Sequence, residues 1–373
     1  MEFSLKRSDL LEPLAKVVGV LEKRQTLPIL SHVLLSVEAE RVTLCGTDQE
    51  VELQTQVDFE AGTIQVQAAG RCAVPGRKLL EICRHLPADA ELSFSLSDAR
   101  LTLTSGAFES QFSTLPAEEF PSLDGYQPPQ QMLTVNAVDL GQMLGKSAFA
   151  MAQQDVRYFF NGMLFELEGL QFKVVATNGQ RLAVVALKQA MTEHQAVGRP
   201  IVPRKGVLEL VKLLDGVEGE VDLGFSDTSI VAQMTGKRFV SKLIDGEYPD
   251  YTKAIPDQPD KRVTCDRGLL RDALIRTAVM SNEVYKNVKL SLQEDKLMLF
   301  TNNPLQEQAE ESLSVEYQGE ALDIGFNIHF LIEALGAMSG KNVSMGFSGQ
   351  TSPCLITDPD DAQATFVVSP MII

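Results

Sequence analysis

LFELEGLQFKVVATNGQRLAVVAL, at residues 164–187, is the stretch that decides the fold. An apolar run, a Glu-Gly turn and a second apolar run lead to a polar break at Thr177, Asn178 and Gly179. β-Branched and aromatic residues fill the runs and glycine marks both breaks, which is typical of strands joined by tight turns. The stretch therefore predicts a strand–turn–strand unit.

A related block occurs in two other places. Residues 34–53 read LLSVEAERVTLCGTDQEVEL, and residues 289–303 read KLSLQEDKLMLFTNN. Aligning Thr47, Thr177 and Thr301 gives offsets of 130 and 124 residues, about the length of one ordinary domain. We therefore predict one structural unit that is repeated three times along the chain.

Two helical patterns accompany each block. In the first repeat, apolar residues at i, i+4, i+7, i+8 and i+11 fall on one face of a helix, and Ser8 is its predicted N-cap. The second pattern keeps its apolar register in all three repeats. The predicted helices span residues 8–24, 77–86, 139–157, 204–213, 266–286 and 327–341.

Alternating apolar and polar residues then predict a strand in each repeat, and such strands form sheets with one buried and one solvated face. Polar, proline-rich joints at residues 125–131 and 255–262 separate the repeats. The predicted fold class is α+β, with three repeated domains of two helices and antiparallel sheets that form an arc and pair their sheet edges. A heterologous contact between the ends would close such arcs into a ring. The expected domains are residues 1–126, 127–254 and 255–373.

The composition is that of a soluble globular protein, with 44% apolar and 22% charged residues. Apolar runs stay shorter than a membrane span, and the N-terminal sequence lacks the apolar centre of a signal peptide, so we expect a cytoplasmic protein. Five scattered cysteines indicate reduced thiols. Four isolated histidines show no metal-ligand spacing, so neither a metal nor another cofactor is expected.

The charge is unevenly distributed. The six predicted helices together carry +5, and because the chain as a whole carries −17, the remainder carries −22. A weakly basic helical surface can attract the phosphates of nucleic acid without reading sequence. Arg77, Lys78 and Arg84 in the first repeat and the acidic residues 306–311 in the third also favour head-to-tail association. The alternative that both are ordinary solvated faces remains open.

Several stretches match a known family. They are TLPILSHVLL at 26–35, QDVRYFFNGMLFE at 154–166, VATNGQRLAVV at 175–185, IVPRKGV at 201–207, DGEYPDY at 245–251, SNEVYKNVKL at 281–290, IGFN at 324–327 and VVSPM at 367–371. On these residues the chain resembles the bacterial DNA polymerase III beta subunits, the β sliding clamps that serve as processivity factors. The similarity runs essentially from end to end.

The resemblance implies a head-to-tail homodimeric ring around duplex DNA, with helices facing the hole and sheets outside. It implies no catalysis and no membrane association. The implied partners are double-stranded DNA, the replicative DNA polymerase catalytic subunit, the clamp loader, translesion and repair polymerases, and other proteins with clamp-binding peptide motifs. A peptide-binding pocket would lie between the second and third domains.

The resemblance also implies three groups of site residues. The pocket would include Phe160, Thr177, Gly179, Arg181, Leu182, Pro249, Lys253, Asn327, Phe330, Val367, Pro370 and Met371. DNA would contact Arg24, Arg77, Gln154, Tyr158, Arg204 and Lys205. The dimer interface would include Lys78, Phe112, Val279, Met280, Glu307 and Glu311.

The sequence departs from the family pattern at several of these sites. Asn178 and Gln180 stand where an aspartate and a histidine are usual, and Lys253 replaces a common arginine. Ser110 stands in the place of an interface aromatic residue, and the tail at residues 369–373 ends in Ile372 and Ile373, which makes it more apolar than usual. These changes bear on peptide affinity and on dimer strength.

Two rival functions are weighed against the clamp. In a hydrolase, Asp48, Asp155 or Glu166 would serve as metal ligands or acid–base groups, but none of them falls in a recognised catalytic motif. A scaffold of the same fold could instead bind peptides and not DNA. The first rival predicts turnover that is lost on mutation of those acids, and the second predicts no retention on circular DNA.

Overall fold

The computed structural model describes residues 1–21, 27–39, 41–57, 64–123, 131–169, 171–187 and 196–372. The chain divides into two compact units, residues 1–137 with 208–243 and residues 138–207 with 244–373, and each is described by itself. Its helices are α1 (Arg7–Val20), α2 (Gly76–His85), α3 (Ala137–Ala148), α4 (Arg204–Leu214), α5 (Arg267–Ala278) and α6 (Ile328–Ala337). Within the described ranges no helix is long and apolar enough to cross a membrane.

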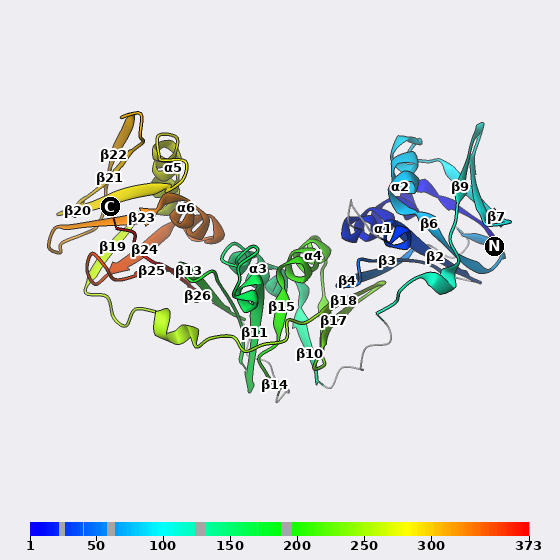
Figure 1. Ribbon diagram of the computed structural model, residues 1–373, viewed down its shortest axis with the longest axis horizontal. Helices are drawn as coiled ribbons and strands as arrows, with labels where there is room; N and C mark the ends of the chain where they lie inside the picture. Colours follow the sequence, from blue (N-terminus) through cyan, green and yellow to red (C-terminus); the bar gives the residue numbers. More distant parts are fainter. Residues whose placement is uncertain are drawn as a thin grey trace. The chain divides into compact units, whose positions relative to one another are not determined.

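The first unit contains two antiparallel sheets (Figure 1). The five-stranded sheet has the order β5 (Gln65–Ala68), β1 (Glu2–Lys6), β7 (Glu91–Ser97), β8 (Arg100–Ser105) and β9 (Phe108–Ser113). The eight-stranded sheet has the order β10 (Gln131–Asn136), β16 (Glu220–Phe225), β17 (Ser229–Met234), β18 (Lys237–Lys242), β4 (Val51–Val57), β3 (Arg41–Thr47), β2 (His32–Glu38) and β6 (Gly70–Pro75). Helix α1 packs on β3, β4 and α2.

The second unit also contains two antiparallel sheets. The larger has the order β14 (Ala196–Gly198), β11 (Gly162–Gly169), β12 (Gln171–Thr177), β13 (Arg181–Ala186), β26 (Asp361–Val368), β25 (Cys354–Asp358), β24 (Asn342–Phe347) and β19 (Lys261–Asp266), and β15 (Ile201–Pro203) also pairs with β11. The smaller has the order β22 (Gln308–Ser314), β21 (Lys296–Asn302), β20 (Asn287–Gln293) and β23 (Leu322–Asn327). Helices α5 and α6 pack against each other (Figure 1).

Strands from different repeats pair edge to edge, as predicted. In the first unit β4 pairs with β18, with Gln54 opposite Arg238. In the second unit β13 pairs with β26, with Leu182 opposite Val367. Backbone hydrogen bonds therefore join the first repeat to the second and the second to the third, and the predicted pairing of sheet edges is confirmed.

A buried carboxylate supports the first of these pairings. Glu52 in β4 is almost fully buried, and its carboxylate accepts a hydrogen bond from the backbone N–H of Leu123 at 2.7 Å. Its other oxygen lies 3.6 Å from the guanidinium of Arg238 in β18. A buried charge is tolerated only when it is paired and hydrogen-bonded, and Glu52 meets both conditions.

The predicted N-cap of the first helix is wrong. Helix α1 begins at Arg7 with Lys6 at the cap position, and no side chain caps it. The Ser8 hydroxyl instead donates to Asp9 Oδ1 at 2.9 Å. Strand β1 runs directly into the helix, and the Arg7 N–H donates to the carbonyl of Ala90, so tertiary contact replaces the local cap.

Four predicted helices end earlier than their patterns indicated: α1 at Val20 and α6 at Ala337 by four residues each, and α3 and α5 by more. Helix α3 ends at Ala148, and α5 ends at Ala278. Gln154 and Lys286, which the patterns included, have φ of 55° and 51°, in the left-handed region that a right-handed helix excludes. The segments after both helices are therefore loops. The five thiols are free, and four of them are buried.

Candidate functional site

A small apolar cavity lies against the β13–β26 pair in the second unit, and we call it the seam cavity. Its volume is about 160 Å³. Phe160, Leu182, Tyr248, Tyr251 and Val367 belong to one buried apolar cluster, so the floor of the cavity continues into the core. The lining residues are Phe160, Thr177, Gly179, Gln180, Arg181, Leu182, Tyr248, Pro249, Asp250, Tyr251, Ala254, Pro353, Val367 and Ser369.

Part of the predicted pocket lines this cavity, and part does not. Seven of the residues named from the sequence come together there: Phe160, Thr177, Gly179, Arg181, Leu182, Pro249 and Val367. Sequence reasoning missed the other seven: Gln180, Tyr248, Asp250, Tyr251, Ala254, Pro353 and Ser369. Three of those missed, Tyr248, Asp250 and Tyr251, lie in the DGEYPDY stretch, which was the signal available for them.

The remaining predicted pocket residues lie outside the lining. Lys253 is well exposed and pairs with Asp250 at 3.3 Å, while Asn327 caps α6 by accepting from the His329 N–H at 3.0 Å. The Phe330 ring packs on Arg181, whose guanidinium carbon lies 4.5 Å from the ring centroid. Two others lie on a separate cavity of about 530 Å³ beside β23, namely Pro370 and Met371.

The turn between β12 and β13 shapes one wall of the seam cavity. Thr177 Oγ1 donates to the Arg181 carbonyl at 2.6 Å and accepts from the Gly179 N–H at 3.0 Å. Asn178 Oδ1 accepts from the N–H groups of Gln180 and Arg181 at 2.9 and 3.0 Å. These bonds satisfy the backbone of the turn locally.

The first repeat builds the same turn with an aspartate. Asp48 Oδ1 accepts from the N–H groups of Glu50 and Val51 at 2.9 and 2.8 Å, and Thr47 Oγ1 donates to the Val51 carbonyl at 2.9 Å. The asparagine oxygen thus accepts the same two backbone hydrogen bonds as the carboxylate. Asn178 in place of the usual aspartate therefore removes a negative charge but preserves the conformation of the turn.

Replacing Asn178 by alanine is expected to destabilise the turn. Two N–H groups lose their acceptor, which costs on the order of 1 kcal/mol for a typical net hydrogen bond. The thermal unfolding midpoint should fall by a few degrees, as measured by calorimetry. Asn178→Asp, which restores an oxygen acceptor, should unfold at the wild-type temperature. An alanine variant as stable as wild type would show that the turn does not depend on this side chain.

Several contacts hold the Arg181 side chain in place. Its guanidinium donates to the Phe149 carbonyl and pairs with Glu333, and its central carbon lies 5.3 Å from the Phe149 ring centroid and 4.5 Å from that of Phe330. Burial lowers the pKa of Arg181, but a guanidinium remains protonated. Nε is buried without a hydrogen-bond partner among the described residues. Arg181 therefore holds a fixed positive charge at the cavity wall.

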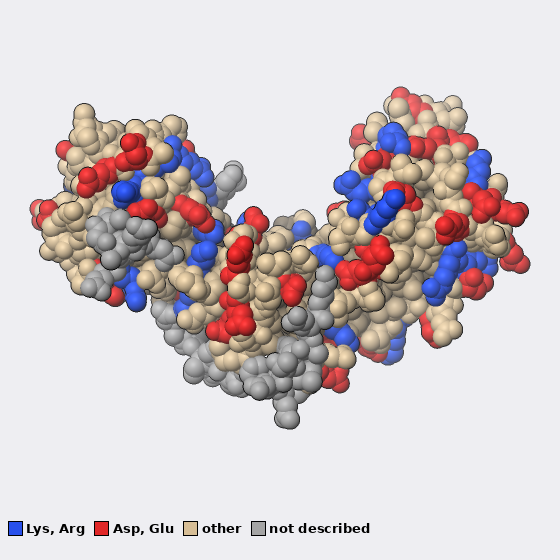
Figure 2. Space-filling model, turned by 180° about the vertical axis from the view of Figure 1, so that it is seen from behind, with Lys and Arg blue, Asp and Glu red and all other residues tan. Residues whose placement is uncertain are grey.

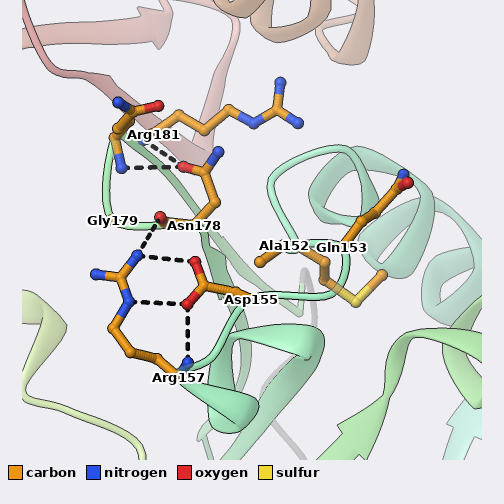
Figure 3. Close-up of a pocket in the computed structure, with 9 residues that line it drawn as sticks. Ala152, Gln153, Asp155, Arg157, Asn178, Gly179 and Arg181 are labelled. Carbon is orange, nitrogen blue, oxygen red and sulfur yellow. Dashed lines mark hydrogen bonds and ion pairs between the residues drawn. The ribbon is translucent and has the colours of Figure 1, made fainter.

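A second, polar cavity of about 650 Å³ shares Gly179, Gln180 and Arg181 with the seam cavity (Figure 3). In its lining, Arg157 Nε and Nη2 donate to Asp155 Oδ1 and Oδ2 at 3.0 and 2.9 Å. These charge-assisted bonds lower the pKa of Asp155 to about 2. The full lining is Met151, Ala152, Gln153, Asp155, Arg157, Asn178, Gly179, Gln180 and Arg181.

Residues 248–254 contribute to the lining of the seam cavity, and hydrogen bonds of Tyr251 hold this segment in place. The Tyr251 hydroxyl donates to Glu166 Oε2 at 2.5 Å, and Arg199 Nη1 lies 2.7 Å from Glu166 Oε1. Burial and the neighbouring carboxylate raise the pKa of Tyr251. Because its pKa is raised above the ordinary value of about 10, the hydroxyl stays a donor throughout the neutral and mildly alkaline range.

Replacing Tyr251 by phenylalanine is expected to loosen this segment without removing the ring. One charge-assisted hydrogen bond is lost, worth about 1.5–3 kcal/mol, so a ligand of the seam cavity should bind roughly tenfold more weakly. Titration calorimetry measures this affinity. Tyr285→Phe, at an exposed tyrosine outside the cavity, is the matched control and should bind normally. Equal affinities for both variants would contradict the anchoring role.

The predicted DNA-contacting residues occupy both units, and Arg24 lies outside the described residues. Arg77 Nη2 donates to the Leu21 carbonyl at 2.5 Å, and Arg204 Nη1 to those of Ala148 and Met151 at 3.3 and 3.4 Å. Gln154 and Tyr158 are exposed, and Lys205 lies in the first turn of α4. Basic and acidic side chains are interspersed over the face shown in Figure 2.

The predicted interface residues differ in exposure. Val279 is 75% exposed and Met280 36%, whereas Phe112 is only 5% exposed. Phe112 could therefore contribute to an interface only indirectly, by positioning the exposed residues around it. Glu311 is already paired with Arg276 at 2.5 Å, and Glu307 accepts from Asn303 Nδ2 at 2.6 Å. Lys78 lies on α2 and is exposed. Phe108 on β9, Ile275 on α5 and Leu305 before β22 are among the other exposed apolar residues.

The carboxylates of the rival hydrolase have structural partners. Asp48 caps a turn, Asp155 pairs with Arg157, and Glu166 binds Tyr251 and Arg199. Among the described residues, no group of three or more histidines, cysteines or carboxylates is placed to hold a metal ion.

Comparison with known proteins defines the class of protein. Models of the N-terminal, central and C-terminal domains of the DNA polymerase III beta subunit match residues 1–124, 134–250 and 252–372 in order. Three consecutive clamp domains of helices and antiparallel sheets make the protein a DNA clamp.

Full-length relatives identify the family within this class. Beta sliding clamps of Pseudomonas putida and Escherichia coli are 41% and 40% identical, with all of each chain covered. The crystal structure of a Pseudomonas aeruginosa sliding clamp bound to griselimycin matches with a TM-score of 0.95 at 41% identity, again over both whole chains. The chain belongs to the DNA polymerase III beta subunit family. The resemblance seen in the sequence is thereby confirmed, and the functional class is that of the processivity clamps of DNA replication.

Proposed function

We propose that this clamp, as a head-to-tail homodimeric ring, encircles duplex DNA and tethers the replicative DNA polymerase through the seam cavity. It acts in the cytoplasm and catalyses no reaction. Its clamp domains are residues 1–126, 127–254 and 255–373, so the seam cavity lies where the second domain meets the third. The geometry of the seam cavity is the observation that carries this proposal.

The seam cavity has the character of a peptide site. Its walls are mostly apolar, and a few fixed polar groups such as Thr177 and Arg181 can orient a bound chain. The griselimycin-bound relative shows that a clamp of this fold accepts a ligand. We propose that the polymerase, the clamp loader, translesion and repair polymerases and other partners each present a short peptide here. Lys253, Asn327, Phe330, Pro370 and Met371 would contact parts of the peptide that extend beyond the cavity.

DNA binding is proposed to be weak and independent of sequence. Arg77, Arg204 and Lys205 supply cations, Gln154 and Tyr158 supply exposed polar groups, and Arg24 completes the set. Phosphate contacts of this kind position a protein on DNA without reading bases, and their affinity falls steeply with salt. Weak contact suits a ring that must move along the duplex while it holds an enzyme near the primer end.

The ring is proposed to close through the exposed apolar end of α5 and the acidic edge of β22 in one chain. The other chain contributes Lys78 and the surface around Phe112. Val279 and Met280 supply the apolar contact, and Glu307 and Glu311 complement Lys78. We expect Val279 and Met280 to supply most of the dimer affinity, because the charge of Glu311 is already neutralised by Arg276 within its own chain.

Retention on circular DNA tests the proposal. Clamp loaded onto nicked circular plasmid should remain bound through gel filtration in high salt and should dissociate once the plasmid is cut, because a ring slides off an end. The same protein mixed with plasmid without a loader is the control and should not be retained. A clamp that binds partner peptides but never remains on closed DNA would instead be a peptide-binding scaffold.

A further inference from the structure

Residues 153–158 form an exposed loop beside the seam cavity. The loop is closed at its base by the Ala152 N–H, which donates to the Phe160 carbonyl at 2.9 Å. The Asn161 side chain accepts from the Asp155 N–H at 2.9 Å and donates to the Asp155 carbonyl at 2.8 Å. The loop therefore has a defined conformation although Val156 is 94% exposed.

Arg157 connects this loop to the wall of the seam cavity (Figure 3). While its guanidinium holds Asp155, Nη2 also donates to the Asn178 carbonyl at 3.1 Å, and its central carbon lies 4.7 Å from the Phe160 ring centroid. A Cβ placed on Gly179 would come within 2.9 Å of Nη1, so the guanidinium packs directly on the turn. The side chain is nevertheless half exposed and open to other ligands.

Aromatic rings form a second connection between the loop and the cavity. Tyr158 packs on Phe159, Phe159 on Phe160 and Phe160 on Tyr248, with centroid separations of 5.6, 4.7 and 5.9 Å. The series begins at an exposed ring and ends at two rings that line the cavity. Tyr158 also packs closely on Gly246, two residues before Tyr248. A displaced loop would therefore disturb the cavity wall.

We propose that Arg157 is a positioning residue through which DNA and peptide binding oppose each other, an inference that rests on the proposed function. Without DNA, the Asp155 carboxylate holds Arg157 against the turn. When the backbone of DNA reaches Gln154 and Tyr158, a phosphate competes with Asp155, because an arginine fork binds phosphate as well as carboxylate. The Asn178 carbonyl in the turn then loses the hydrogen bond from Arg157, and the Phe160 ring loses its contact with the Arg157 guanidinium. The seam cavity therefore binds its ligand less tightly.

Reciprocity gives the proposal a measurable form. If DNA weakens ligand binding by some factor, the ligand must weaken DNA binding by the same factor. Griselimycin, which is bound to the Pseudomonas aeruginosa clamp, is proposed as the ligand of the seam cavity, and a short primed duplex at low ionic strength serves as the DNA. Calorimetric titration of the full chain with each, alone and in the presence of the other, should show a reduction of about tenfold in both affinities, within the usual range of such coupling.

Arg157→Lys is the decisive variant. It keeps the charge but cannot bind Asp155 and Asn178 together, so griselimycin should bind more weakly without DNA, and added duplex should change its affinity less than twofold. Asp155→Asn should bind the duplex more tightly and griselimycin more weakly. The matched control is Arg84→Lys, at an equally exposed arginine that pairs with Glu81 at 2.8 Å, and it should keep the tenfold effect.

Three outcomes would overturn the inference. Wild-type protein that binds both ligands independently would leave the proposed function standing and remove the coupling. Arg157→Lys with undiminished coupling would mean that the two ligands collide directly or communicate by another route. Wild-type protein that binds neither griselimycin nor DNA would contradict the proposed function itself, and the inference would fall with it.

Discussion

Replacing Arg181 by alanine is expected to weaken the binding of griselimycin, the proposed ligand of the seam cavity, by at least about a hundredfold, the size of effect seen at central interface residues. The substitution removes a wall that the seam cavity shares with the polar cavity, and it leaves the Phe149 carbonyl without this donor. It also frees the Phe330 ring from the guanidinium on which it packs. Titration calorimetry on the full-length variant measures the loss.

Two companion variants separate the causes of this effect. Arg181→Lys keeps a positive charge but loses the planar contact with both rings, so most of the loss should persist. Glu333→Gln should bind almost normally, since its side chain is partly exposed and an exposed ion pair contributes at most about 1 kcal/mol. Thermal unfolding of each variant shows whether it is folded. A folded Arg181→Ala protein of unchanged affinity would remove the seam cavity from the proposed function.

Replacing Val279 by aspartate is expected to convert the proposed dimer into monomers. Val279 is three-quarters exposed in the single chain, so the substitution leaves the core intact and places a charge in the apolar centre of the contact. Burying that charge without a partner costs several kcal/mol, which is enough to raise the dissociation constant by more than a hundredfold. Sedimentation velocity over a range of concentrations measures the change.

The control for this variant is Val156→Asp, at a valine that is still more exposed and lies in the 153–158 loop. It should sediment as the wild-type dimer. Glu311→Lys should weaken the dimer less than Val279→Asp. The Glu311 carboxylate is already paired with Arg276 in the same chain, so its loss affects that pair before it affects the interface. If Val279→Asp sediments as a dimer, the interface lies elsewhere on the chain.

Repetition explains why much of the fold could be predicted. Thr47 and Thr177 open turns that use the same hydrogen bonds, so a pattern in one repeat supported its reading in the other. The strand pairing between repeats followed from open sheet edges and is confirmed by the pairing of Leu182 with Val367. The apolar periodicity that predicts a helix or strand depends only on nearby residues, and the three repeats showed the same pattern independently.

The site was harder to predict because its residues meet only after the strands pair. Tyr248 and Tyr251 read as an irregular segment, and only tertiary contact makes them the wall of a cavity. Local pattern also misjudged the ends of α3 and α5, where left-handed residues interrupt an apparently helical stretch. The family resemblance implied a surface role for Phe112, but strand alternation alone could not show that this ring faces the core.

The β13–β26 ladder has a consequence for drug resistance. Leu182 and Val367 face each other across this ladder and also line the cavity, so the same two side chains shape the proposed ligand site and help join two parts of the protein. A substitution that narrows the cavity must overpack this joint, which typically costs 1–3 kcal/mol. Escape from a compound that fills the space around these residues would therefore carry a fitness penalty, whereas escape through the exposed Lys253 would not.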